Sequence, residues 1–160
     1  MTNPQIQAWL DQEDTFVAQT IRRYGVFIQY VSGDPAEVPE SFAYTVGLFG
    51  LGHPELVVTD IDQGTAHGLL NEVSGRVKVG GDLVPGELLT FDKWPHRVVV
   101  EKLPNPGEVV FAANRHYQRP PEASVPALVL TYDDVHGNFP WDRGYCNPPA
   151  IQPRPGTWSA

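Results

Sequence analysis

Residues 42–61 read FAYTVGLFGLGHPELVVTDI, and this stretch decides the fold of the chain. It contains two apolar runs, at 42–49 and 55–61, that are rich in the β-branched and aromatic residues enriched in strands. The segment GLGHP between the runs contains two glycines and a proline, which is typical of a turn. Neither run alternates strictly between apolar and polar residues, so both are predicted to be central strands of a sheet.

An amphipathic helix is predicted before these two strands, and a second helix after them. Apolar residues recur close to the helical period in residues 4–24, where Pro4 suits the first turn and Gly25 suits the end. The same period returns in residues 63–77. The other predicted elements are strands at 26–31, 87–92, 97–103 and 127–132 and a short helix at 109–117.

The order of these elements predicts an α+β fold. Helices and strands do not alternate as in a doubly wound sheet, so we expect a single domain with a mostly antiparallel sheet and about three helices. Turns and prolines dominate from residue 133 onward, which predicts an extended proline-rich C-terminal arm docked through aromatic side chains. We expect the domain to span residues 1–152 and residues 153–160 to form a flexible tail. The predicted core is Trp9, Val17, Ile21, Phe27, Val46, Leu48, Val57, Leu70, Val99 and Leu130.

Charge and composition narrow the classes of function. The chain has 160 residues, with 11 Lys and Arg against 19 Asp and Glu, which gives a formal net charge of −8. Nucleic-acid binding relies on clustered basic residues, so no nucleic-acid partner is expected. The sequence shows no signal peptide and no membrane-spanning stretch, and its single cysteine, Cys146, has no intramolecular disulfide partner. These features predict a soluble cytoplasmic protein that does not bind a membrane.

The segment Gly52-His53-Pro54-Glu55 is the sharpest candidate for chemistry. Pro54 favours an extended backbone at His53, and side chains two apart on an extended chain project to the same side. Glu55 could therefore orient the His53 imidazole for general acid–base work, which makes these two residues the candidate catalytic pair. One alternative is that the two side chains are ligands of a metal, and another is a turn in which both side chains bond to backbone groups.

Several other residues are candidate ligand contacts. Tyr44 and Thr45 point to opposite faces of their strand, so at most one of them enters a given pocket. Asn71 shares a face of the second helix with His67. The C-terminal Trp141 and Asp142 could roof the pocket, with Trp141 stacking on a planar ligand. The alternative is that the aromatic side chains only pin the arm to the domain.

Most familiar motifs are missing from the sequence. The five histidines lie on separate segments, and no HExxH or paired CxxC pattern is present, so no metal ligands are predicted. Nucleotide-binding glycine loops and a GxSxG nucleophile motif are also absent. Cys146 would act as a nucleophile only with a base such as His136 beside it. The sequence identifies no cofactor.

Four separated motifs resemble those of the bacterial domain of unknown function 4262 family. They are FAYTVGL, GHPELVV, a helix bearing LLN, and DDVHGNFPWD, and they occur in the expected order from about residue 44 to 152. The resemblance implies a compact cytoplasmic bacterial domain and no particular reaction. The positions that match the family pattern are Tyr44, Thr45, Gly47, His53, Pro54, Glu55, Asn71, Phe139, Pro140, Trp141 and Asp142.

Two functional hypotheses follow. The first is a domain with a polar pocket for a small molecule, where His53 and Glu55 perform acid–base chemistry and Tyr44, Asn71 and Asp142 contact the ligand. The second is a non-catalytic interaction module, such as an immunity-like or adaptor protein, that binds a basic protein partner through its acidic surface. The sequence leaves open whether the protein is an enzyme and which oligomeric state it adopts.

Overall fold

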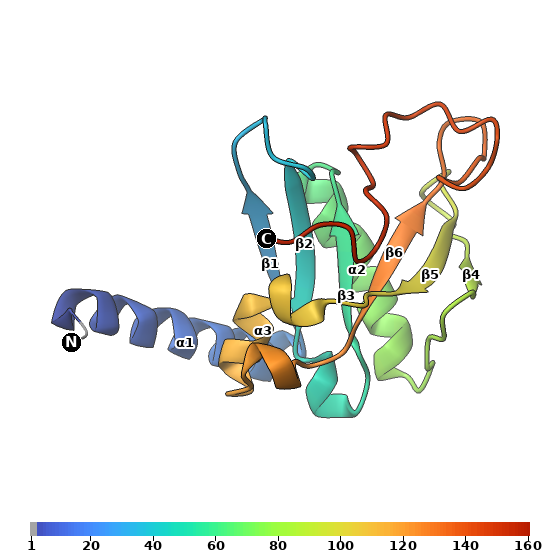
Figure 1. Ribbon diagram of the computed structural model, residues 1–160. Helices are drawn as coiled ribbons and strands as arrows, with labels where there is room; N and C mark the ends of the chain where they lie inside the picture. The colour runs from blue at the N-terminus through green and yellow to red at the C-terminus, as the bar shows by residue number, and fades with distance from the viewer. Residues whose placement is uncertain (1–2) are drawn as a thin grey trace.

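The computed structural model describes residues 3–160 and contains one sheet of six strands within them (Figure 1). The order across the sheet is β1-β2-β3-β6-β5-β4. In this part of the chain β3 and β6 are parallel neighbours, and the other neighbouring strands are antiparallel. The strands are β1 (Phe27–Ser32), β2 (Ser41–Val46), β3 (Glu55–Thr59), β4 (Leu88–Leu89), β5 (Val98–Lys102) and β6 (Ala127–Tyr132).

Three α-helices accompany the sheet within the described residues: α1 (Pro4–Tyr24), α2 (Gln63–Lys78) and α3 (Phe111–His116). Single-turn 3₁₀ helices lie at η1 (Leu48–Leu51), η2 (Pro106–Glu108) and η3 (Pro121–Ala123). Side-chain oxygens of Asn3 and Asp62 accept hydrogen bonds from the first turns of α1 and α2, which is how these residues favour helix starts. Gly25 ends α1 with a φ of 87°, in the left-handed region that glycine adopts without strain.

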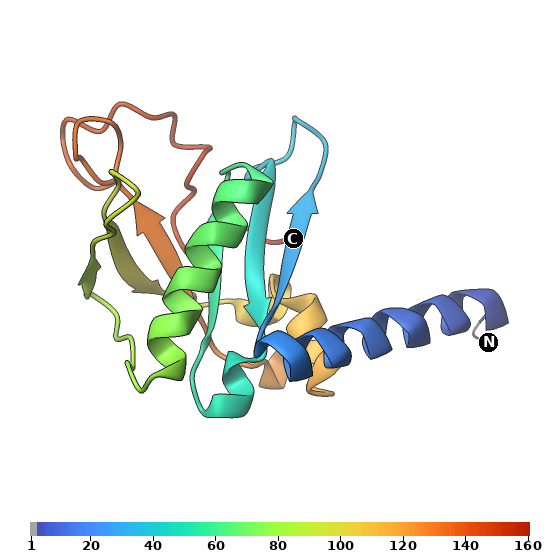
Figure 2. The ribbon, with the colours of Figure 1, turned by 180° about the vertical axis from the view of Figure 1, so that it is seen from behind.

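The two faces of the sheet carry two separate apolar clusters. α2 lies across one face, where Leu56 and Val58 of β3 belong to its cluster (Figure 2). The other face contributes Val57 to a second cluster, which contains Val17 of α1 and Ala113 of α3. Because successive strand residues point to opposite faces, a single strand supplies side chains to both clusters.

The structure confirms the predicted fold class, a single α+β domain with three helices and a mostly antiparallel sheet. The predicted bounds of α1 and β6 match the observed ones. The strand expected at 42–49 is shorter, because residues 48 and 49 turn into η1. Their backbone N–H groups bond to the Glu55 side chain instead of a neighbouring strand.

The first half of α1 projects away from the domain (Figures 1 and 2). Placing Trp9 in the core was therefore wrong, since 58% of this residue is exposed. The helical period of the apolar residues is present, but packing begins only near Val17, the buried residue of this helix. No helix in the described part of the chain is long and apolar enough to cross a membrane.

The C-terminal segment, residues 133–160, follows β6 without further helix or strand. Phe139 is 6% exposed and Trp158 is 7% exposed, so aromatic side chains hold both of its ends against the domain. The Trp158 ring lies 5.1 Å from that of Phe42, between ring centroids, and Ala160 donates a backbone hydrogen bond to Glu108. Residues 153–160 were expected to form a flexible tail, whereas Trp158 packs them against the second cluster.

Candidate functional site

Glu55 lies in the interior, at the start of β3, and its side chain is fully buried. Each of its carboxylate oxygens accepts two hydrogen bonds, from the Thr45 hydroxyl and from the backbone N–H groups of Gly47, Leu48 and Phe49, at 2.8–3.1 Å. Burial raises the pKa of the Glu55 carboxyl above its usual value, while these four donors favour the ionised form. The carboxylate therefore satisfies the first N–H groups of η1 and has no bond to His53.

His53 is also buried, with 3% of the residue exposed. Its Nε2 accepts a hydrogen bond from the Leu83 backbone N–H at 3.1 Å, so the ring proton lies on Nδ1. Nδ1 then donates this proton to the carbonyl oxygen of Pro54, 2.7 Å away. Both nitrogens are used inside the protein, and the imidazole ties the loop before β4 to the turn before β3.

The remaining predicted contacts near this turn lie on different sides of the sheet. The Tyr44 hydroxyl accepts a hydrogen bond from the Ala112 N–H at 2.9 Å on the α3 side, and burial raises the pKa of Tyr44 to about 12. The Thr45 hydroxyl accepts from Leu56 and donates to the Glu55 carboxylate. Asn71 is exposed on α2, across the sheet from Tyr44. The structure thus joins Thr45 to Glu55 and separates Tyr44 from Asn71.

Trp141 and Asp142 lie in the C-terminal segment. The Trp141 ring is stacked on Phe139 at 5.1 Å between centroids, and the Arg154 guanidinium lies 5.1 Å from its centre. Asp142 accepts a hydrogen bond from the Phe139 N–H at 2.8 Å, which closes a local turn. Trp141 remains 48% exposed, although Phe139 and Arg154 both lie against its ring.

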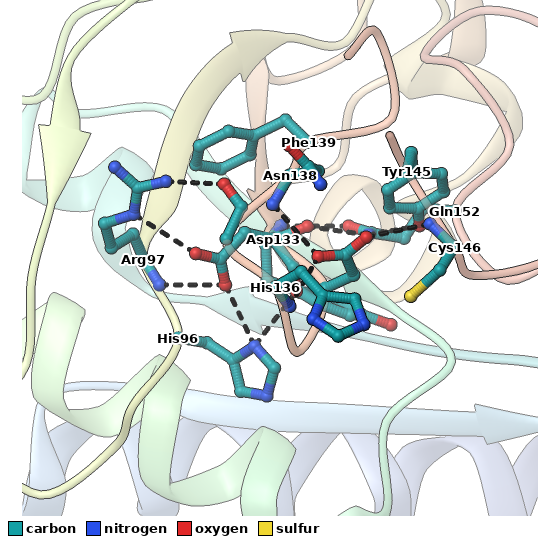
Figure 3. A network of polar contacts seen from close by, with 12 residues as sticks. His96, Arg97, Asp133, His136, Asn138, Phe139, Tyr145, Cys146 and Gln152 are labelled. Carbon is teal, nitrogen blue, oxygen red and sulfur yellow. Dashed lines mark hydrogen bonds and ion pairs between the residues drawn. The ribbon is translucent and has the colours of Figure 1, made fainter. Parts of the chain in front are cut away.

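A second polar cluster lies at the carboxyl end of β6, where two acidic residues occur in succession (Figure 3). Asp133 is 3% exposed and accepts hydrogen bonds from the Nδ1 of His96 at 2.9 Å and from the Nε of Arg97 at 3.1 Å. Asp134 is 2% exposed and accepts from the backbone N–H groups of residues 136, 138 and 146. One carboxylate therefore faces the start of β5, and the other organises the C-terminal segment.

His96 differs from His53 in having one free nitrogen. Its Nδ1 donates to Asp133, whereas its Nε2 has no partner within residues 3–160 and is not among their buried unpaired atoms. The His96 side chain is 25% exposed, and its ring lies 4.8 Å from that of Trp94. A buried carboxylate thus orients a half-buried imidazole whose other nitrogen is accessible, an arrangement suited to proton transfer.

Asp134 affects the acidity of the thiol of Cys146, the single cysteine. Burial acts to raise the pKa of the Asp134 carboxyl, but hydrogen bonds from Asn138, Cys146 and His136 outweigh it and lower the pKa below its usual range. The ionised carboxylate accepts from the Cys146 thiol and raises the pKa of that thiol. Because the thiolate is the nucleophile, this environment disfavours a nucleophilic role for Cys146.

A cleft of about 210 Å³ lies between α2 and the connection from β4 to β5. We call it the α2 cleft; it is lined by Thr65, Gly68, Leu69, Glu72, Phe91, Lys93 and Trp94. A Cβ atom added at Gly68 would meet nothing within 4 Å, so the missing side chain leaves this part of the cleft open. Trp94 forms one wall and also lies against His96.

Metal ligands are not gathered anywhere in the described chain: no group of three or more His, Cys, Asp or Glu side chains is positioned to hold an ion. At the end of β6, hydrogen-bond donors already surround both aspartates. The geometry fits proton transfer better than metal coordination.

Sequence reasoning placed the catalytic pair at His53 and Glu55 and passed over His96 and Asp133. The residues were visible as the segments KWPH and YDDVH, each next to a predicted strand. The missing step was strand pairing: Val98 lies opposite Tyr132, which brings the residues before β5 beside those after β6. The order of the strands in the sheet was needed to join them.

The fold and this cluster define an α+β domain with a carboxylate–imidazole pair at the end of a central strand. The chain belongs to the family described as a domain of unknown function, DUF4262, whose sequence profile matches residues 20–146. No curated protein and no solved structure matches the chain.

Proposed function

We propose that this protein binds a small molecule in the α2 cleft and that His96 is its acid–base group. The observation that carries the proposal is the His96 imidazole, which Asp133 orients through Nδ1 while Nε2 remains accessible beside Trp94. Trp94 connects the two parts of the site, because it lines the cleft and contacts the imidazole. A larger hollow of about 470 Å³ beside Val38 has no such group in its lining.

His96 can work as a base because its proton is held on the far nitrogen. With Nδ1–H bonded to Asp133, the Nε2 lone pair is available to accept a proton from a ligand or from water. The Asp133 carboxylate, which also forms an ion pair with Arg97, would stabilise the resulting imidazolium. The initial candidates, His53 and Glu55, have no free polar atom for this task, so we assign them a structural role.

The lining of the α2 cleft indicates the chemical class of the ligand. The Phe91 and Trp94 rings pack edge to face, 5.8 Å apart between centroids, and the Arg76 guanidinium lies over Phe91, so the remaining ring surface offers an apolar wall for a flat group. Thr65, Glu72 and Lys93 add a hydroxyl and two opposite charges at the rim. We therefore expect a planar molecule with at least one polar substituent.

A glycine-filling experiment tests the ligand-binding part of the proposal. Gly68→Leu places a side chain in the cleft, and Gly75→Leu adds the same side chain elsewhere on α2, where a Cβ also meets nothing within 4 Å. The probes are planar aromatic fragments carrying an amide, carboxylate or amine, followed through the Trp94 indole N–H signal in ¹H–¹⁵N spectra. We expect fragments to shift this signal in the parent and in Gly75→Leu but not in Gly68→Leu. Equal shifts in both variants, or none in the parent, would refute binding in the cleft.

The acid–base part is tested separately, with p-nitrophenyl acetate as a chromogenic ester. His96→Gln and His67→Gln are compared in a Cys146→Ala background, so the thiol does not contribute. Water activated by the imidazole would release p-nitrophenol and acetate, and we expect His96→Gln to lose most of the protein-dependent rate. His67 is exposed and has no carboxylate partner in the described chain, so His67→Gln should keep the rate. Equal rates in both variants would remove His96 from the proposal.

The alternative is a non-catalytic module that binds a basic protein through its acidic surface. The observation that favours it is the formal net charge of −8. Partner binding would then weaken steeply with added salt and would be unchanged in His96→Gln and Gly68→Leu.

A further inference from the structure

The two edges of the sheet differ in length. At one edge lies β4, which has two residues, and at the other lies β1, which has six. An edge strand presents backbone N–H and C=O groups without partners, and proteins usually protect such an edge with a very short strand, a charged residue, a proline or a bulge. The shortness of β4 protects one edge. β1 contains no charged residue, no proline and no glycine, so the other edge has none of these protections.

The strand register shows which side of β1 is unpaired. Ser32 lies opposite Ser41, and the next residue, Gly33, donates a backbone hydrogen bond to the Glu40 carbonyl oxygen. Bonded and non-bonded pairs alternate along an antiparallel pair of strands, so Ser32 and Ser41 form a non-bonded pair. The carbonyl oxygen of Ser41 accepts instead from the Asp60 N–H, on the β3 side. The backbone groups of Ser32 therefore point away from β2.

The same alternation applies to the rest of β1. Ile28, Tyr30 and Ser32 all direct their N–H and C=O groups away from β2, and we call this row of groups the β1 edge. Within residues 3–160 one further contact reaches it, a hydrogen bond of 3.4 Å from the Gln29 side-chain amide to the Tyr30 carbonyl oxygen. In both views no other strand or helix of the described chain runs along this side of β1 (Figures 1 and 2). The β1 edge can therefore bond to an extended segment.

The side chains next to the β1 edge are mostly apolar on both faces of the sheet. Ile28 and Tyr30 belong to the cluster on the α2 face, whereas Phe27 and Val31 pack against the second cluster. Tyr30 and Val31 are only partly buried, so part of each side chain is available to a neighbouring strand. β-Branched residues pair well with such neighbours across strands. The segment that fits here is uncharged and rich in valine, isoleucine or threonine.

The loop after β1 indicates the charge of the adjoining part of that segment. Residues 33–40 contain Asp34, Glu37 and Glu40, which are all exposed, and no basic residue. No lysine or arginine occurs in the sequence between Arg23 and Arg76. Charge complementarity across an interface favours the correct partner and disfavours others. Residues of the segment that lie beside this loop should therefore be lysine or arginine.

We propose that the β1 edge binds an extended segment of a partner protein, antiparallel to β1, with basic residues at the N-terminal end of the segment. Antiparallel pairing is slightly more stable per residue than parallel pairing, and it places the N-terminal end of the segment beside Ser32 and the acidic loop. Strand addition of this kind is a recurring mode of peptide recognition. The β1 edge lies at the other end of the sheet from β4, away from the α2 cleft, so the inference does not rest on the small-molecule proposal.

A single segment fits the β1 edge better than a second copy of the whole chain. If two copies of β1 paired symmetrically about Tyr30, Asp34 of one copy would lie opposite Val26 of the other. The loop of residues 33–40 would then continue past the end of α1, which projects beyond β1 on this same side (Figures 1 and 2). A single segment can end beside Ile28 and does not have to pass the helix.

Synthetic peptides test the proposal on the full chain. The probe is acetyl-KKKTVTVTV-amide, and the two comparison peptides are acetyl-TVTVTVKKK-amide and acetyl-EEETVTVTV-amide. Binding is followed through the backbone N–H signals of Ile28, Tyr30 and Ser32 in ¹H–¹⁵N spectra. We expect the probe to shift these three signals and to bind at least about tenfold more tightly than either comparison peptide.

A proline substitution tests the backbone contact itself. Ser32→Pro removes one outward N–H group, and proline is tolerated in edge strands at positions whose N–H faces solvent. Ser32→Ala keeps this N–H and is the matched control. We expect Ser32→Pro to weaken binding of the probe by about tenfold, the scale of one lost hydrogen bond, and Ser32→Ala to bind as the parent does. Urea unfolding checks that both variants are folded.

Charge variants test the role of the acidic loop and do not depend on the folding of Ser32→Pro. The double variant Glu37→Lys, Glu40→Lys changes the loop beside the β1 edge. The control is Asp82→Lys, Asp92→Lys, which makes the same charge change at exposed sites on either side of β4. Only the first double variant should weaken binding of the probe.

Three results would overturn the proposal. The first is a parent chain whose Ile28, Tyr30 and Ser32 signals do not shift at about 1 mM probe, on the order of the weakest specific affinities. The second is equal affinity for the probe and for either comparison peptide, which would refute the charge or the direction of the segment. The third is a dimeric parent chain that Ser32→Pro converts to a monomer, which would assign the β1 edge to a second copy.

Discussion

Two histidines of this protein show how differently the same side chain can be used. His53 is 3% exposed, and both of its ring nitrogens are bonded to backbone groups. The His96 side chain is 25% exposed, and only its Nδ1 is bonded, to a buried carboxylate. The difference is in hydrogen-bond saturation, because a fully bonded imidazole stabilises a structure and a half-bonded one can exchange a proton.

The acidic residues beside them repeat this contrast. The Glu55 carboxylate accepts four hydrogen bonds and satisfies N–H groups at the start of η1. The Asp133 carboxylate bonds to Nδ1 of His96 and leaves Nε2 of that ring accessible. If this comparison is right, substitutions near His53 should cost stability, and substitutions near His96 should cost chemistry. Four predictions test it, in order of decreasing effect on stability.

The largest effect is expected for Glu55→Ala. Removing the carboxylate leaves the buried N–H groups of Gly47, Leu48 and Phe49 without acceptors, so we expect a loss on the order of 4 kcal/mol. Urea unfolding measures the loss, and Glu122→Ala, at an exposed site, is the control. A loss below about 1 kcal/mol would show that η1 does not depend on this side chain.

A smaller loss is expected for His53→Ala. The substitution leaves the Leu83 N–H unpaired and creates a small cavity, which together cost about 2–3 kcal/mol. Thermal and urea melts should show this loss, and His67→Ala should be neutral because His67 is exposed. An unchanged melt for His53→Ala would return His53 to the list of functional candidates.

The contribution of Asp134 to the free energy of unfolding should depend on pH. Its folded-state pKa is lowered, so its contribution to stability is present above the unfolded pKa, about 4, and is lost as the pH falls through the folded value. Asp134→Asn should therefore be less stable than the parent at pH 7, with the two converging in acid. Unfolding free energies measured from pH 7 to pH 3 would check this, and a constant difference across that range would contradict it.

The smallest effect on stability is expected for His96→Gln. Glutamine can still donate a hydrogen bond to Asp133, and the site is partly exposed, so the change should stay within about 1 kcal/mol. The comparison is sharpest if this variant also loses the ester-hydrolysis rate. A loss of stability as large as that of His53→Ala would make His96 structural too.

The fold was predictable where its signals are local. α1 from Pro4 to Tyr24 and β6 from Ala127 to Tyr132 follow from apolar periodicity, proline and glycine. Trp9 shows the limit of that reasoning, since the helical period identifies an apolar face but not whether anything packs against it.

The site was less predictable because it depends on pairing and on backbone direction. The spacing of His53 and Glu55 correctly places both near the start of β3, yet it cannot show that the N–H groups of η1 turn toward the carboxylate. His96 and Asp133 become neighbours only through the antiparallel pairing of β5 with β6. A short stretch of sequence does not show which distant strands pair, so it cannot predict contacts of this kind.

The parallel pairing of β3 with β6 also has a consequence for how the chain assembles. Strands β1 to β3 come from the first half of the chain and β4 to β6 from the second, and the two sets of strands meet where Leu56 lies opposite Leu128. Contacts between segments so distant in sequence form late in folding, because a long loop must close first. A chain cut in the loop between α2 and β4 should therefore yield two fragments that reassemble through the pairing of β3 with β6 when mixed.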